Sequence, residues 1–250
     1  MWRRLRPWCF PLGLLLLFEA YVRTSAMGSD SLAPPSAAVL AFVGALRDGS
    51  LWQATLFTLA AAAAGLAAAA ALALPLGIAL GLAPRAARIT ALSIELLRPI
   101  PSVALIPLAM LVFGFGLRME SAVVAFACFW PLLILTRAAV TQVEPRLLEV
   151  SQVLGLSAWQ RGCKIVLPAI VPRLFVALRL GVAIALVVAV TVEIAANPNG
   201  MGYAMMIAQQ SLDPALMLAW LGWIGGVGVA INAAALWLQQ RVAVAMGALA

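Results

Sequence analysis

Two long stretches without a charged residue constrain this chain more than any other feature of its sequence. Between Asp48 and Arg85, 36 consecutive residues carry no charge, and between Asp213 and Arg241 another 27 carry none. A helix needs only about 20 apolar residues to cross the hydrocarbon core of a bilayer. Charged residues make up 10% of the whole chain, against about 25% in a soluble domain. The sequence therefore predicts an all-α membrane protein.

Six segments are apolar and long enough to be transmembrane helices. We expect them at residues 8–26, 52–82, 89–114, 120–140, 174–195 and 215–239. The third segment contains Pro99, Pro101 and Pro107. Because each proline removes a backbone donor and bends or breaks a helix, we expect a broken span there.

Two further features concern the shape of the helices. Pro75, Gly77 and Gly81 lie near the far end of the second span, and they predict a kink or a close approach to another helix. The stretch 36–46 has apolar residues at helical spacing but is too short to span. We expect it to be an interfacial helix.

The N-terminal segment has some features of a signal peptide, because Arg3, Arg4 and Arg6 precede its apolar run. Glu19 and Arg23, however, are four residues apart and would face each other on a helix. Such a pair suits a span that packs against protein. We therefore expect an uncleaved first span.

The distribution of basic residues predicts the orientation in the membrane. With six spans both termini lie on one side, and eleven of the 16 Lys and Arg residues fall on that side against three on the other. By the positive-inside rule, both termini and the long polar loop 141–173 are cytoplasmic. The expected location is the bacterial inner membrane, as a multi-pass protein. This asymmetry accounts for the formal net charge of +7 without nucleic acid.

The predicted spans divide the chain into three parts. Residues 1–50 hold the first span, an extracytoplasmic loop and the interfacial helix. Residues 51–240 form the transmembrane domain, which includes the cytoplasmic loop 141–173. Residues 241–250 are a short cytoplasmic tail.

The composition excludes many kinds of enzyme active site. The chain has no histidine, which removes zinc sites built on imidazole, His-assisted nucleophiles and His proton relays. Its three cysteines form no C-x-x-C pair. A Gly-x-x-x-x-Gly-Lys-Ser/Thr loop is missing too, so the chain cannot hold ATP phosphates in the P-loop manner. We expect no catalytic residue, no metal site and no cofactor in this chain.

The polar loop 141–173 has the pattern of a helix. Glu144-Pro145 favours a helix start, because proline in the first turn loses no hydrogen bond. Gly155 is the matching stop. Between them Leu147, Val150 and Leu154 share one apolar face.

A second short helix is expected after this first one. Ser157-Ala158-Trp159-Gln160 has the form of a capping box, and Pro168 is expected to end the helix. From these residues alone, the loop is either a packed connection between spans or a surface that docks a partner.

The loop resembles the EAA loop of ABC importer permeases. That family's pattern is E-A-A, three residues, G, nine residues and I-x-L-P. Here Glu149-Val150-Ser151, Gly155 and Ile165-Val166-Leu167-Pro168 stand at the same spacing, with Val150 and Ser151 in place of two alanines. The resemblance implies an ATPase-coupling loop whose residues are Glu149, Val150, Ser151, Leu154, Gly155, Ile165, Leu167 and Pro168.

Other segments are similar to the permeases of the nitrate, sulfonate and taurine type, and with the loop they cover residues 50–210. These segments are Leu97-Arg98-Pro99-Ile100-Pro101, Ala104-Leu105-Ile106-Pro107-Leu108, Phe113-Gly114-Phe115-Gly116, Phe129-Trp130-Pro131, Thr136, Val192-Glu193 and Gly200-Met201-Gly202-Tyr203.

The resemblance implies a type I ABC importer with a fold like that of methionine permeases. Its expected partners are a second copy of this chain, a pair of ATPase subunits that bind ATP and magnesium, and an extracytoplasmic solute-binding protein. The implied substrate is a small anion such as an aliphatic sulfonate, taurine or nitrate. A pyrimidine vitamin precursor or an aromatic acid is the alternative within the family. Outside it, a channel, a secondary transporter or a membrane scaffold stays open.

Two charged residues, three prolines and one tryptophan inside the spans are candidates for the translocation pathway. They are Arg98, Pro99, Pro101, Pro107, Trp130 and Glu193. Each charge also has a structural interpretation. Glu95 would neutralise Arg98 three residues away, Arg179 would extend toward the cytoplasm, and Glu193 would brace the loop 197–203 or an outer gate.

Overall fold

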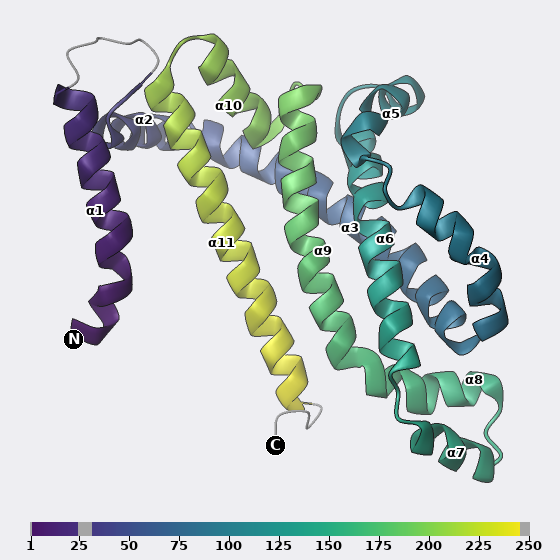
Figure 1. The fold of residues 1–250 in the computed structure, drawn as a ribbon. Helices are drawn as coiled ribbons and strands as arrows, with labels where there is room; N and C mark the ends of the chain where they lie inside the picture. Colours follow the sequence, from purple (N-terminus) through teal and green to yellow (C-terminus); the bar gives the residue numbers. More distant parts are fainter. Residues whose placement is uncertain (1, 25–31, 246–250) are drawn as a thin grey trace.

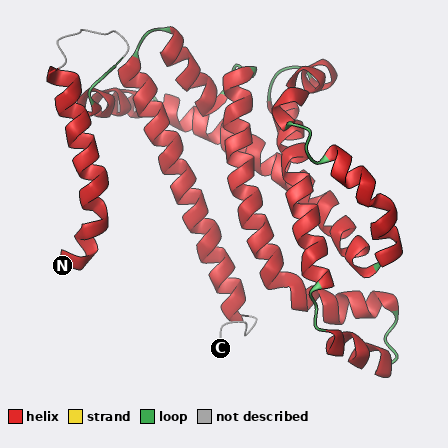
Figure 2. Cartoon of the chain, in the orientation of Figure 1, coloured by secondary structure: helices red, strands yellow, loops and turns green. Residues whose placement is uncertain are grey.

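The computed structural model describes residues 2–24 and 32–245, and every regular element in this part of the chain is helical (Figure 2). In chain order the elements are α1 (Trp2–Thr24), α2 (Pro35–Arg47), α3 (Ser50–Leu82), α4 (Pro84–Leu97), a 3₁₀ turn (Ser102–Leu105), α5 (Ile106–Phe113), α6 (Leu117–Thr141), α7 (Pro145–Val153), α8 (Ala158–Arg161), a π-helical turn (Gly162–Val166), α9 (Leu167–Ala195), α10 (Gly200–Gln210) and α11 (Pro214–Ala245).

Helices α3, α6 and α9 form the centre of the molecule (Figure 1). Helix α11 packs on one side of this centre, and α4 and α5 lie on the other. Helices α2 and α10 lie at one end of the bundle. Helices α7 and α8 lie at the opposite end, together with the N-terminal end of α1 and the C-terminal end of α11.

Four helices in the described part of the chain are long and apolar enough to cross a membrane, namely α3, α6, the continuous helix Gly162–Ala195 and α11. A fifth span results if α4 is counted together with Ser102–Phe113, to which it is bent by 80°. Helix α1 is not among these candidates, so the count of six spans stays a prediction. The end of the predicted first span, residues 25–26, lies outside the described residues.

The break in the third span is confirmed. Pro99 and Pro101 lie between α4 and the 3₁₀ turn. Because neither proline is inside a helix, their missing backbone donors break no helical hydrogen bond. Pro107 has a different place from the one expected, because it lies in the first turn of α5. A proline there starts a helix rather than breaking it.

The expectation that Pro168 ends a short helix is wrong. Residues 162–195 run as one helix, and Pro168 lies in the first turn of α9, directly after the π-helical turn. Proline is tolerated in that position because the backbone donors of a first turn have no partner within the helix. The fifth span therefore starts before residue 174.

The loop expected at residues 197–203 is helical from Gly200 onward, because α10 begins there and runs to Gln210. Gly200, with φ +90°, begins this helix. Its start is held by contacts to other helices rather than by a local pattern. Met201 donates its backbone N–H to Thr58 Oγ1 of α3 at 3.0 Å.

A buried polar cluster surrounds this start. Glu120 of α6 and Glu193 of α9 are both fully buried, and their carboxyl groups contact each other. Asn197 donates its side-chain amide to Glu120 Oε2, and Gly202 donates its backbone N–H to Glu193 Oε2 at 2.8 Å. Glu120, expected only as the boundary of the fourth span, is therefore part of the link between α6, α9 and α10.

Close packing joins α3 to α6 along their length. A Cβ atom built on Gly77 would lie 2.7 Å from Thr136 Cβ and 3.0 Å from the carbonyl oxygen of Leu133. Gly65 and Gly81 approach valines of α6 equally closely. The close helix approach predicted from the glycines near Pro75 is thus confirmed, and it leaves no room for a side chain at these positions.

The predicted pair Glu19 and Arg23 forms an ion pair, with 2.5 Å between Arg23 Nε and Glu19 Oε1. Glu19 Oε2 also accepts the backbone N–H of Ser36 at 3.0 Å. These contacts link α1 to the start of α2. The helix predicted at residues 36–46 is present as α2, and its place at a membrane surface stays a prediction.

Adding one methyl group between α3 and α6 should destabilise the fold. We expect Gly77→Ala to lower the free energy of unfolding by about 1–3 kcal/mol, because the new Cβ forces the two helices apart. The control is Gly225→Ala on α11, where a Cβ meets nothing within 4 Å. Thermal unfolding of the purified protein in detergent, followed by circular dichroism, measures the effect. Equal melting temperatures for the two variants would contradict the close packing.

A second substitution tests the polar cluster. A Cβ on Gly200 would collide with Glu193 Oε1, at 1.9 Å. Gly116, with φ +108°, has a similarly unfavourable backbone for a side chain, but open space around it. We expect Gly200→Ala to lower the melting temperature clearly more than Gly116→Ala, since only the former adds a collision to the backbone strain. The same loss in both variants would show that the cluster does not hold α10.

Candidate functional site

The loop after α6 folds as its sequence predicts. Helix α7 begins at Pro145 and ends before Gly155, whose φ of +65° suits glycine. The backbone N–H of Leu156 donates to the carbonyl oxygen of Ser151 at 3.0 Å, a bond that closes the end of many helices. A side chain on Gly155 would meet nothing within 4 Å, so this turn is open to a partner.

The predicted capping box is also present. Ser157 donates its backbone N–H to Gln160 Oε1 at 3.0 Å, and the Gln160 N–H donates to Ser157 Oγ at 3.2 Å. These reciprocal bonds satisfy two backbone donors at the start of α8. The loop therefore presents two short helices with a defined turn between them.

One face of α7 exposes apolar side chains, and we call it the α7 apolar patch: Leu147, Val150, Val153 and Leu154. Val153 is 88% exposed and Leu154 64%. The sequence pattern identified the other three residues but not Val153, the most exposed of them. An apolar surface of this kind at a polar end of a molecule is typical of a docking site.

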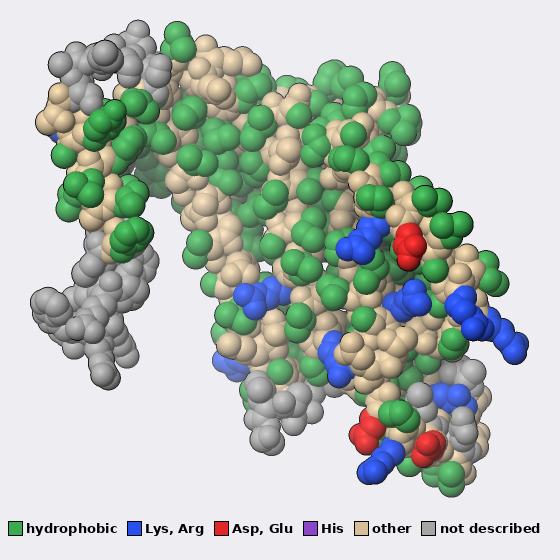
Figure 3. Space-filling model, in the orientation of Figure 1, with side chains coloured by type: hydrophobic (Ala, Val, Ile, Leu, Met, Phe, Trp, Pro, Cys, Tyr) green, Lys and Arg blue, Asp and Glu red, His purple; other side chains and the backbone are tan. Residues whose placement is uncertain are grey.

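The other predicted coupling residues differ in exposure. Ser151 is buried beneath it and Glu149 is exposed. Ile165 is half-buried, and Leu167 and Pro168 are exposed at the start of α9. In the described part of the chain Glu149 forms no ion pair, whereas Arg146 Nε lies 4.0 Å from Glu144 Oε1. Basic side chains are spread over the lower half of the face in Figure 3, and near α7 and α8 acidic side chains accompany them.

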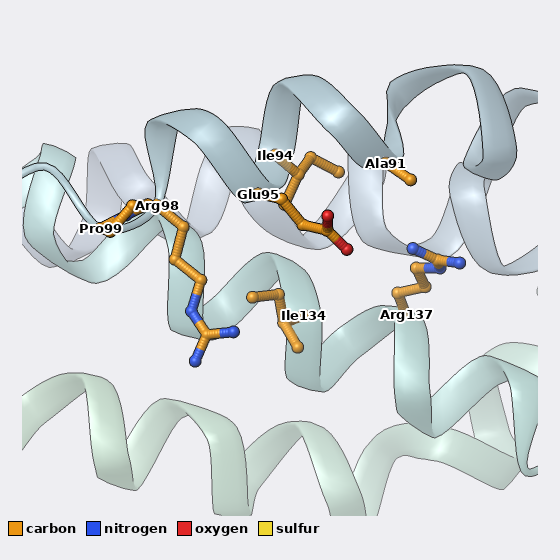
Figure 4. Close-up of a pocket in the computed structure, with 7 residues that line it drawn as sticks. All are labelled: Ala91, Ile94, Glu95, Arg98, Pro99, Ile134 and Arg137. Atoms are coloured by element: carbon orange, nitrogen blue, oxygen red, sulfur yellow. The ribbon is translucent and has the colours of Figure 1, made fainter.

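A cavity of about 600 Å³ lies between α4 and α6. Its lining, drawn in Figure 4, consists of Ala91, Ile94, Glu95, Arg98, Pro99, Ile134 and Arg137. The two arginines lie at opposite ends of the lining, and the Glu95 carboxylate is turned toward Arg137 (Figure 4). A smaller cavity of about 260 Å³ shares Arg137 and continues along α6 to Thr141. Together they form a groove, which we call the α4/α6 groove.

Of the predicted pathway residues, the groove contains Arg98 and Pro99 but not Pro101 or Pro107. Arg137 lies inside the predicted fourth span, 120–140, but was not among the pathway candidates; its charge within a span was the signal that could have included it. The expected neutralisation of Arg98 by Glu95 is wrong, because the described residues contain no ion pair between them.

The remaining candidates lie elsewhere. Trp130 packs edge-on against Phe126 and Phe129 of its own helix, at centroid distances of 5.7 and 4.9 Å. Glu193 is buried in the polar cluster, a place that supports its bracing role. Arg179 donates from its Nε to Asn232 Oδ1 of α11 at 3.1 Å, and its extension toward the cytoplasm stays a prediction.

No group of three side chains suited to a metal ion occurs among the described residues. The arrangement is suited to binding and docking. Two guanidinium groups lie in the α4/α6 groove, and the α7 apolar patch lies at one end of the molecule.

Comparisons with known proteins identify the family. Residues 69–246 match the model of the binding-protein-dependent transport system inner membrane component. The SsuC protein of Bacillus subtilis (strain 168), named as an aliphatic sulfonates transport permease, is 29% identical over 80% of this chain and 72% of its own length. The riboflavin transport system permease protein RibX of Chloroflexus aurantiacus is 36% identical over 82% of this chain and 76% of its own.

A solved structure of another protein has a similar fold. A chain in an inward-facing structure of the MetNI methionine ABC transporter superimposes with a TM-score of 0.68 at 18% identity, over 75% of this chain and 93% of that one. This likeness confirms the predicted fold class. The family match covers most of the chain, and the apolar helices give it a multi-pass membrane character. The chain belongs to the family of binding-protein-dependent transport system inner membrane components, and it is a permease subunit of an ABC importer.

Proposed function

We propose that this permease imports small anions, driven by a separate ATPase that docks on its α7 apolar patch. The observation that carries the docking is the exposure of Val153, Leu154 and Val150 on one short helix with a defined end. Burying such apolar side chains against a partner removes them from water, which favours docking. ATP and magnesium would be bound by the ATPase.

We further propose that the end carrying α7 and α8 faces the cytoplasm. The N-terminal end of α1 and the C-terminal end of α11 lie at the same end (Figure 1). The excess of basic residues on that side supports this orientation by the positive-inside rule. An extracytoplasmic binding protein would then meet the end formed by α2 and α10.

Two copies of the permease would enclose the pathway. Glu95 and Arg98 are exposed on α4, a helix of the broken span. Charged side chains are costly when they face lipid, so they face protein or water. A second copy covering this side would provide that environment, which supports a homodimer with the α4/α6 grooves turned inward.

An anionic substrate is supported by two observations. The α4/α6 groove carries two arginines and one glutamate, and a relative is named for aliphatic sulfonates. Another relative is named for riboflavin, so a vitamin is the second candidate substrate.

ATPase docking is tested by changing Gly155. We expect Gly155→Asp to weaken docking strongly, because it adds a negative charge to the turn that meets the partner. Gly155→Asn is the matched control, since asparagine has the same size and also tolerates a positive φ. The measurement is affinity purification of the tagged permease from its native membrane in mild detergent, with mass spectrometry of the proteins that co-purify.

We expect an ATPase subunit in an amount about equal to the permease for the unaltered chain and for Gly155→Asn, and a reduced amount for Gly155→Asp. An oligomer of the permease without any ATPase, in all three samples, would instead support a channel or a secondary transporter. Co-purification that is the same in all three would mean that the turn at Gly155 is not part of the docking surface.

A further inference from the structure

Two arginines in the α4/α6 groove have no partner within the fold. In residues 2–24 and 32–245, neither Arg98 nor Arg137 forms a hydrogen bond or an ion pair. The arginines of α9 differ from them. Arg173 donates to the carbonyl oxygen of Ala139 at 3.3 Å, and Arg179 donates to Asn232. The fold thus satisfies the arginines of α9 and leaves the two in the groove free to bind something else.

The place of these arginines makes a bound anion favourable. Helix α4 ends part-way between the two ends of the bundle, where the broken span turns (Figure 1). A guanidinium group at such a depth is costly unless water or an opposite charge accompanies it. Guanidinium groups also match the oxygen atoms of carboxylates, sulfonates and phosphates, which they bind through parallel hydrogen bonds.

We propose that the α4/α6 groove binds the transported anion during its passage, with Arg98 and Arg137 as the residues that hold it. This inference rests on the proposed function, import of small anions, and assigns the residues and the charge class of the substrate. The anion contacts Arg98 near the break in the span and then Arg137, one turn before the end of α6. The smaller cavity along α6 leads from Arg137 to Thr141.

The lining determines which anion fits. Two arginines and one glutamate leave one net positive charge, which suits a monovalent anion. Glu95 lies between the arginines along the groove (Figure 4). Its carboxylate can accept a hydrogen bond from the ammonium group of an amino sulfonate. No aromatic residue lines the groove, so it has no surface on which the rings of a flavin would stack. The groove therefore favours a small sulfonate over riboflavin.

Glu95 also limits the strength of binding. Its carboxylate is turned toward Arg137 (Figure 4), so it competes with the substrate for that guanidinium group. A step in a transport pathway must bind well enough to be entered and weakly enough to be left. Glu95 serves the second requirement, and Glu95→Gln should make the anion bind more tightly and leave more slowly.

The transport test uses the complete importer in right-side-out vesicles, with labelled taurine and labelled ethanesulfonate as probes. We expect Arg98→Gln and Arg137→Gln each to lower uptake roughly tenfold or more, the effect of losing a charged hydrogen-bond partner. Arg88→Gln is the matched control, because it removes the same charge from the exposed surface of α4 outside the groove. The Gln variants should retain the co-purifying ATPase. Arg98→Lys and Arg137→Lys should retain part of the uptake.

A labelling test examines the groove without any partner protein. Ile134 lies in the lining, and Ile134→Cys, in a chain with Cys9 and Cys163 changed to serine, offers a thiol there. Cys128 is fully buried and stays in place. We expect a methanethiosulfonate reagent with a sulfonate group to react at least tenfold faster than one with a trimethylammonium group. Arg137→Gln should remove this preference, and ethanesulfonate, but not riboflavin, should slow the reaction.

The two tests separate the inference from the proposed function. If the sulfonate reagent has no advantage, or if both Gln variants take up the probes as Arg88→Gln does, the α4/α6 groove is not an anion site. Slowing by riboflavin instead of ethanesulfonate would overturn the assigned charge class. If no ATPase accompanies the unaltered permease but the labelling preference is present, the groove assignment stands and the ATPase-driven function falls.

Discussion

The close contact between α3 and α6 is the constraint on which the rest of the structure depends. Within a membrane, helices gain little from the hydrophobic effect against each other, and van der Waals packing must hold them together. Glycines at positions 65, 77 and 81 bring the two backbones within a distance that no side chain would allow. With α9 packed against the same pair, this centre positions α4 and α5 on one side and α11 on the other, and it holds the coupling loop at the end of α6.

Charged side chains in the bundle fall into two groups with different consequences. Glu120, Glu193 and Arg179 each form a hydrogen bond with a neighbouring segment, and these bonds hold α10 and α11 to the centre. Arg98 and Arg137 have no such partner and line the α4/α6 groove. Because an unpaired charge inside a membrane protein is costly, the fold retains it only where a ligand or water can approach. The division between these groups is the physical basis for the proposed transport step.

Local patterns were predictive wherever the interactions themselves are local. The capping box at Ser157 and the glycine stop at Gly155 both follow from residues within a few positions of each other. The break at Pro99 and Pro101 follows from missing backbone donors. Helix α10, by contrast, was missed, because its start depends on Thr58 of α3, distant in the sequence, and on Glu193 of α9 rather than on its own residues. The continuous helix through Pro168 was missed because the π-helical turn before it has no clear local signature.

By itself, the sequence determined the all-α membrane class, the broken third span and the EAA-like loop, since hydrophobicity, proline chemistry and turn residues act over short distances. Only the tertiary structure decided which charges are partnered. Glu95 and Arg98 have the spacing of an ion pair but do not form one. Arg98 and Arg137 are 39 residues apart in the chain, yet both line the groove between α4 and α6. Side-chain partners depend on how helices pack, and no pattern within a single helix specifies that packing.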